Sequence, residues 1–203
     1  MKTEPSEPPL RVAYQGGPGC NSERAGLTLL HDAFFGWPFA SFAEAAANLA
    51  SGQVDLAILP VHNSSTGDIA PALRSIRLWK LVALEEITLR IEHWLMAAPG
   101  WRMADLREVM AHPQVIAQCG RWLAGCGLAV QAVDDGARQV AQAVRFRSGA
   151  AILGPKGIGE ATGLYCLAGP LQDDPENRTR FRLLARADGR AQHIKRQLAR
   201  AGA

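Results

Sequence analysis

The chain has 203 residues, 48% of them hydrophobic and 20% charged, which is ordinary for a globular protein with room for one large domain or two lobes. Its formal net charge is +3, but residues 188–203 alone carry four Lys or Arg side chains against one Asp, so the remainder is formally neutral and lacks the basic surface of a nucleic-acid binder. The 4 cysteines form no C-x-x-C pair, and neither an apolar run of about 18 residues nor an apolar leader is present, so we expect reduced thiols, no membrane contact and a cytoplasmic location.

The first part of the chain alternates between strand and helix patterns. Residues 1–9, rich in proline and glutamate, predict a disordered leader. The elements expected next are a strand at 10–14, a helix at 23–35 capped by Asn21 or Ser22, a helix from Ser41 to Gly52, a strand at 54–59 that Pro60 ends, and a helix that begins near Ile69.

The pattern restarts after residue 82. The elements expected there are a long strand at 83–98, a helix near 103–110, a helix opened by His112-Pro113, a strand at 128–133, a helix at 136–147, a strand at 150–153, a final strand at 181–185 and a basic amphipathic helix at 191–200. We interpret the long strand as the crossing into a second lobe. The predicted organisation is therefore a first lobe of residues 10–84 plus 170–187, a second lobe of residues 85–169, and a basic tail of residues 188–203.

The alternation of strands and helices predicts an α/β protein with a mostly parallel sheet in each lobe. Open sheets of this kind bind ligands beyond the carboxyl ends of their strands. Three polar loops occupy such places, at 15–22, 61–67 and 173–180. The first is glycine-rich and leads into a helix, so its backbone N–H groups are candidates for holding an anion, although a plain turn explains it equally well.

The other two loops carry candidate side chains. Asn63-Ser64-Ser65-Thr66-Gly67 crowds small hydrogen-bonding residues beside a buried strand, which suits a small polar ligand. Thr179 and Arg180 place a hydroxyl beside a cation just before a strand, although arginines in loops are usually solvated. No metalloprotease, paired-cysteine, hydrolase-elbow or P-loop motif occurs, so we expect chemistry by hydroxyls, amides and arginines without a metal or cofactor.

Taken in order, four motifs resemble the prephenate dehydratase family. They are Val12-Ala13-Tyr14-Gln15-Gly16 with Gly19 and Ser22, then Asn63-Ser64-x-x-Gly67, then His112-Pro113-Gln114 with Gln118-Cys119, and then Asn177-x-Thr179-Arg180-Phe181. The resemblance runs from about Leu10 to Ala187.

The resemblance implies a two-lobed fold like the type 2 periplasmic binding proteins, with the site in the cleft between the lobes. It also implies conversion of prephenate, a small dicarboxylate, to phenylpyruvate by decarboxylation and loss of water, without a cofactor. Thr179 would protonate or hydrogen-bond the leaving hydroxyl, Phe181 would shape the ring pocket and Arg180 would hold a carboxylate. The remaining substrate-binding residues would be Ser22, Asn63, Ser64 and Gly67.

Departures from the family pattern leave alternatives open. His62 stands where the family has glutamate, and Asp135 adds a negative charge before a predicted helix. One alternative is a homologue that acts on arogenate or a related cyclohexadienyl acid, or that decarboxylates prephenate without aromatising it. Another is a non-catalytic module that binds small anions. We expect neither a regulatory ACT domain nor a chorismate mutase domain, and a homodimer contact through the basic tail stays open beside a solvated tail.

Overall fold

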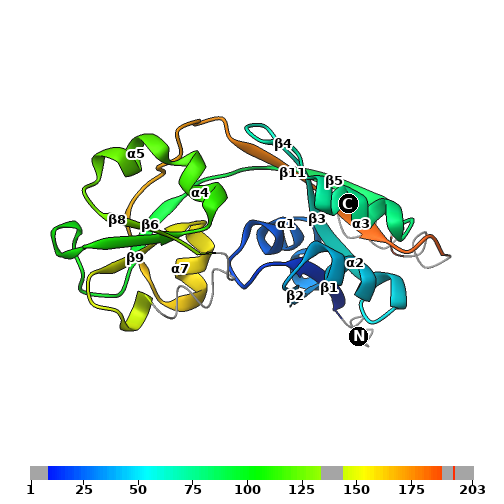
Figure 1. The fold of residues 1–203 in the computed structure, drawn as a ribbon. Coiled ribbons are helices and arrows are strands. Elements are labelled where there is room, and N and C mark those ends of the chain that lie inside the picture. The colour runs from blue at the N-terminus through cyan, green and yellow to red at the C-terminus, as the bar shows by residue number, and fades with distance from the viewer. Residues whose placement is uncertain (1–8, 134–143, 189–193, 195–203) are drawn as a thin grey trace, which may run out of the picture.

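The computed structural model describes residues 9–133, 144–188 and 194, and the chain folds into two lobes (Figure 1). The first lobe contains a six-stranded sheet and the second a five-stranded sheet. The elements of the first lobe are β1 (Leu10–Gln15), α1 (Asn21–Leu30), η1 (His31–Ala33), β2 (Phe34–Phe39), α2 (Phe42–Ser51), β3 (Leu56–Asn63), β4 (Gly67–Asp68), α3 (Ala70–Leu78), β5 (Val82–Arg90) and β11 (Arg178–Ala185). Those of the second are β6 (Trp94–Ala97), η2 (Met103–Asp105), β7 (Glu108–Ala111), α4 (Pro113–Gln118), α5 (Gly120–Gly125), β8 (Ala129–Ala132), β9 (Ala150–Gly154), α7 (Lys156–Thr162) and β10 (Tyr165–Ala168).

Each sheet is mixed, so the prediction of a mostly parallel sheet was only partly right. The first sheet has the order β2-β1-β3-β11-β5, with β4 beside β3, and β11 runs antiparallel to both of its neighbours. The second has the order β10-β6-β9-β7-β8, and β6 runs antiparallel to both of its neighbours. In both lobes the parallel pairs are those joined through helices, as the connection rules require.

Alternate residues of the central strands pack against helices on opposite faces of the sheet. On β3, Leu56 and Ile58 pack with Ala25 of α1, whereas Ala57 and Leu59 pack with residues of α2 and α3. The second sheet is sandwiched in the same way between α7 on one face and α4 and α5 on the other. Because both faces are buried, the central strands read as continuous apolar runs rather than as alternating ones.

Two segments cross between the lobes (Figure 1). The outgoing segment covers residues 91–93, and the returning segment runs between β10 and β11. They are hydrogen-bonded to each other: Leu171 N donates to His93 O at 2.9 Å, and Ile91 N donates to Asn177 O at 2.8 Å. The expected long strand at 83–98 is thus two strands, and the chain changes sheet later than the predicted boundary after residue 84.

Several other predicted elements have different bounds, or are of a different type, in the structure. The helix at 23–35 ends at Leu30, and the edge strand β2 follows it. The helix near 103–110 is a 3-10 turn followed by β7. Pro60 does not end β3, because a β-bulge opposite Arg180 and Phe181 of β11 accommodates it.

Part of the prediction lies outside the described residues: the leader 1–8, most of the helix at 136–147, and the tail except Asp188 and Ile194. Ile194 is buried in the core of the first lobe. Among the described helices, none combines the length and the apolar character that a membrane span needs.

Candidate active site

A cleft of about 650 Å³ lies between the lobes. Residues from both sheets line it: the loop after β1 and the end of β3 from the first lobe, and the start of α4 and the end of β9 from the second. Of the seven residues predicted for the site, Ser22, Asn63, Thr179 and Phe181 line this cleft. Ser64, Gly67 and Arg180 do not line it.

Thr179 and Asn63 face each other across neighbouring strands. Thr179 of β11 is in register with Asn63 of β3, and Asn63 Nδ2 donates to Thr179 Oγ1 at 2.9 Å. Both residues are buried, with 7% and 2% of their surface exposed. The expectation that Thr179 lies in a loop was wrong, because β11 begins one residue earlier, at Arg178. A strand holds the hydroxyl more firmly than a loop would.

The orientation of the Asn63 amide is fixed by its oxygen. Asn63 Oδ1 accepts hydrogen bonds from Ser65 N at 3.1 Å, Thr66 N at 3.1 Å and Thr66 Oγ1 at 3.2 Å. The amide nitrogen must therefore be the group that points at β11, and Asn177 Oδ1, just before that strand, also accepts from it at 2.7 Å. Because Thr179 Oγ1 accepts a hydrogen bond from Asn63, its own proton stays available for donation to a ligand.

Ser64 and Gly67 build the loop that encloses this amide. Ser64 Oγ accepts from Arg178 N, and Ser64 N donates to Arg178 O, both at 2.9 Å. Gly67 has φ of 78°, a left-handed conformation that other residues adopt only with strain. These two residues shape the loop, Ser64 through its hydroxyl and backbone and Gly67 through its backbone, and neither lines the cleft.

Arg180 points away from the cleft. Its side chain is half-exposed and its Nε lies 3.9 Å from Glu86 Oε2, on the surface of the first sheet. Side chains of a strand alternate between faces, so Arg180 cannot share the face on which Thr179 lies. The neighbouring Phe181 is 2% exposed and lies in the same core cluster as Tyr14, where it forms an apolar part of the cleft wall.

The loop after β1 begins α1 in a different way from that predicted. Cys20, not Asn21 or Ser22, is the N-cap: Cys20 Sγ accepts from Glu23 N at 3.4 Å. Burial raises the pKa of the Cys20 thiol to about 11, so the thiol stays neutral near pH 7. Ser22 is 6% exposed and lines the cleft in the first turn of α1, where the helix leaves N–H groups without partners of its own.

Two polar groups of the second lobe complete the cleft. His112 caps α4, with its Nδ1 accepting from Gln114 N at 3.2 Å, as the sequence predicted for this helix start. His93, which the sequence analysis did not single out, is 3% exposed and lies 2.8 Å through its Nε2 from Gln118 Oε1. In the sequence it stands beside Glu92, just before an apolar run at 94–98, and nothing there marks it as part of a site.

Charge is absent from the described wall of the cleft: among its described residues none is Asp, Glu, Lys or Arg. Asp135, which the sequence analysis marked as unusual, lies outside the described residues. His62, the other unusual residue, does not line the cleft, and its Nδ1 is 2.9 Å from Asp68 Oδ1. In the described ranges no group of three His, Cys, Asp or Glu side chains is placed to hold a metal ion.

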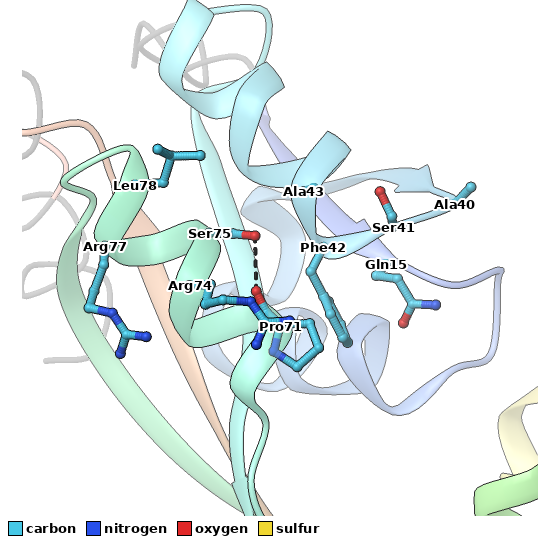
Figure 2. Close-up of a pocket in the computed structure, with 10 residues that line it drawn as sticks. All are labelled: Gln15, Ala40, Ser41, Phe42, Ala43, Pro71, Arg74, Ser75, Arg77 and Leu78. Atoms are coloured by element: carbon cyan, nitrogen blue, oxygen red, sulfur yellow. Dashed lines mark hydrogen bonds between the residues drawn. The ribbon is translucent and has the colours of Figure 1, made fainter.

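A second hollow, of about 860 Å³, lies on the first lobe between the start of α2 and α3. Figure 2 shows Phe42 on one side and Arg74 and Arg77 of α3 on the other, with Ser75 Oγ donating to Pro71 O at 3.0 Å. None of the seven predicted site residues lines it, and every described residue that lines it belongs to the first lobe. We therefore place the candidate site in the cleft between the lobes.

Comparison with known proteins identifies the family of this chain. The family model described as prephenate dehydratase matches residues 12–189. Arogenate dehydratase 2 of Petunia hybrida is 37% identical over 92% of this chain and 47% of its own length. The bifunctional chorismate mutase/prephenate dehydratase of Pseudomonas aeruginosa is 31% identical over 88% of this chain and 49% of its own length. The chain thus spans about half the length of these relatives.

Solved structures show the same fold. A structure described as a novel type of quorum quenching acylase, GqqA, has a TM-score of 0.77 at 28% identity, over 88% of this chain and 65% of that one. Prephenate dehydratase from Arthrobacter aurescens in complex with L-Phe has a TM-score of 0.79 at 23% identity, over 89% of this chain and 61% of that one. The methionine-binding protein MetQ reaches 0.51 at 13% identity, over 95% and 89% of the two chains, so the predicted fold class is confirmed.

Proposed function

The chain belongs to the prephenate dehydratase family, and from this premise we propose that it converts prephenate to phenylpyruvate in the cleft between its lobes. One observation carries the proposal: the Thr179 hydroxyl is buried in the cleft and accepts a hydrogen bond from Asn63, which leaves its own proton for the substrate.

The reaction mainly requires the protein to hold the substrate and the proton donor in place. The bond from the ring to its carboxylate breaks and releases carbon dioxide, and its electron pair enters the ring. The bond from the ring to its hydroxyl breaks, the oxygen takes up one proton, and water leaves as the ring becomes aromatic. The Thr179 hydroxyl is the donor that meets the departing oxygen, while Asn63 holds Thr179 Oγ1 in place.

The described cleft offers neutral hydrogen-bond donors for a dianionic substrate. We propose that the first turn of α1, with the Ser22 hydroxyl and the backbone N–H groups of the helix start, holds one carboxylate. Neutral donors hold a carboxylate less tightly than arginine does, which suits a group that must leave as carbon dioxide. Phe181 and Ile158 give the ring an apolar surface.

Arogenate is the second candidate substrate, because the Petunia relative is named for it. Arogenate carries an ammonium group where prephenate has a keto oxygen. The described residues of the cleft include no carboxylate to pair with an ammonium group, which favours prephenate. The retained Thr179 favours an aromatising elimination over decarboxylation alone.

The test is to incubate the purified protein with each acid at neutral pH. We expect phenylpyruvate from prephenate, detected by its absorbance in alkali, and at least tenfold slower formation of phenylalanine from arogenate. Consumption of prephenate without an aromatic product would support a non-aromatising decarboxylase. If the protein turned over neither acid, the remaining reading would be a module that binds small anions without catalysis. This result would contradict the proposal.

A further inference from the structure

His93 lies where the two crossing segments meet. Its N–H donates to Gln172 Oε1 at 3.1 Å, and its carbonyl accepts from Leu171 N at 2.9 Å. The residue is 3% exposed, yet it lines the cleft. The imidazole is thus held at the junction of both lobes and the site.

The ring has one hydrogen-bond partner in the described part of the chain. Its Nε2 lies 2.8 Å from Gln118 Oε1, whereas its Nδ1 is buried and has no hydrogen-bond partner among the described residues. If Nε2 carries the proton and donates it to Gln118 Oε1, Nδ1 keeps a lone pair that accepts no hydrogen bond. If Gln118 were turned so that its amide nitrogen donated to Nε2, the proton would sit on Nδ1, and a buried N–H without an acceptor costs more than an unused lone pair.

A charged ring is disfavoured for the same reason, because it would carry both protons. Burial lowers the pKa of His93, in agreement with a neutral ring near pH 7. The arrangement with the lowest cost is therefore a neutral imidazole whose Nε2–H donates to Gln118 Oε1.

This arrangement fixes the side chain of Gln118, the last residue of α4. Its backbone carbonyl accepts from Asp173 N at 2.7 Å, which ties the helix end to the returning segment. With Oε1 turned to His93, the amide nitrogen keeps two N–H groups that bond to nothing in the described chain. Since Gln118 lines the cleft, these are donors for an anion bound there.

We propose that His93 is a positioning residue: by donating Nε2–H to Gln118 Oε1, it turns the Gln118 amide nitrogen toward the anionic substrate. The proposal rests on the proposed function to the extent that it assumes an anionic substrate in this cleft. The imidazole itself takes no proton from the substrate.

Two substitutions with similar side chains separate this role from a structural one. In His93→Gln the amide nitrogen reaches the place of Nε2, whereas in His93→Asn it reaches only the place of Nδ1. We expect His93→Gln to stay within about threefold of the wild type and His93→Asn to raise KM about 10- to 100-fold, the effect of losing a hydrogen bond to a charged group, with a smaller change in kcat. Equal activity of the two variants would overturn the proposal.

The His93→Asn substitution in a Gln118→Ala background tests whether His93 acts through Gln118. We expect Gln118→Ala to raise KM by a similar factor and His93→Asn to add less than about twofold to it. Fully additive losses would show that His93 acts on its own, and would overturn the proposal.

A measurement that does not depend on turnover tests the role of His93 separately from the proposed function. Nitrogen-15 spectra of the histidine rings, with the His93 signal assigned by its loss in His93→Gln, report which ring nitrogen carries the proton. We expect a neutral ring protonated at Nε2 at pH 7. A ring protonated at Nδ1, or at both nitrogens, would overturn the positioning role even if the protein is an active dehydratase. Failure of the wild type to turn over prephenate would instead contradict the proposed function.

Discussion

The backbone of Gly19 in the first lobe lies against the backbone of Gly157 in the second. Gly19 belongs to the loop before α1, and Gly157 is the second residue of α7 in the other lobe. A Cβ on Gly157 would lie 2.7 Å from Gly19 O, closer than real Cβ contacts allow. The lobes can approach to this distance only because neither residue has a side chain.

Gly157→Ala should therefore hinder closure of the cleft while leaving the second lobe intact. The clash costs about 1–2 kcal/mol, which corresponds to a roughly 5- to 30-fold lower kcat/KM. The melting temperature should not fall, because alanine favours a helix over glycine. The matched control is Gly125→Ala in α5, where a Cβ would meet nothing within 4 Å. Equal activity of the two variants would contradict a role for the contact.

Asn63→Ala should destabilise the fold as well as slow the reaction. It leaves the buried Asn177 Oδ1 without its partner, and it removes the part-buried oxygen that accepts from Ser65 N and Thr66 N. Such a loss lowers the free energy of unfolding by about 1–3 kcal/mol, measurable by urea denaturation. Asn48→Ala, which removes a more exposed bond to Glu44 O, should change this free energy by less than about 0.5 kcal/mol. Similar values for the two variants would contradict the structure around Asn63.

Arg180→Ala should leave catalysis nearly unchanged. Its guanidinium pairs with Glu86 on the surface of the sheet and lies outside the cleft, so we expect kcat/KM within about threefold of the wild type. Losing a surface ion pair changes stability by about 0–1 kcal/mol. A tenfold or larger rise in KM would show that Arg180 holds a substrate carboxylate, as the family resemblance implied.

The Cys20 thiol should contribute to stability below pH 9 and not to catalysis. Its folded pKa of about 11 exceeds the ordinary value of 9.0, so its contribution is complete below pH 9 and is lost as the pH rises toward 11. We expect Cys20→Ser to keep its activity. Its melting temperature should fall less between pH 9 and pH 11 than that of the wild type. A parallel decline of both proteins would contradict this assignment.

The sequence predicted the buried residues at the centre of the site better than the residues around them. Asn63 and Thr179 were both expected at the site, and in the structure a hydrogen bond joins their side chains. Arg180 was expected beside them because residues 173–180 had been assigned to a loop. The strand that forms there places Arg180 on the opposite face, and its pairing with β3 and β5 depends on residues far away in the sequence.

Tertiary pairing also explains the elements that the sequence missed. β2 contains Gly36 and Pro38, which both disfavour strands, but it is an edge strand and a proline is tolerated there. β7 has no clear strand pattern of its own and forms because β8 and β9 flank it in parallel. His93 was overlooked because its partner, Gln118, is 25 residues away.

The most direct test of the central claim is the rate at which Thr179 variants form phenylpyruvate from prephenate. Thr179→Ser retains a hydroxyl where Asn63 can hold it and should stay within about tenfold of the wild-type kcat. Thr179→Val keeps the shape but has no proton to give, and should lower kcat about 100-fold or more at a similar KM. A Thr179→Val enzyme with the kcat of the wild type would contradict the account.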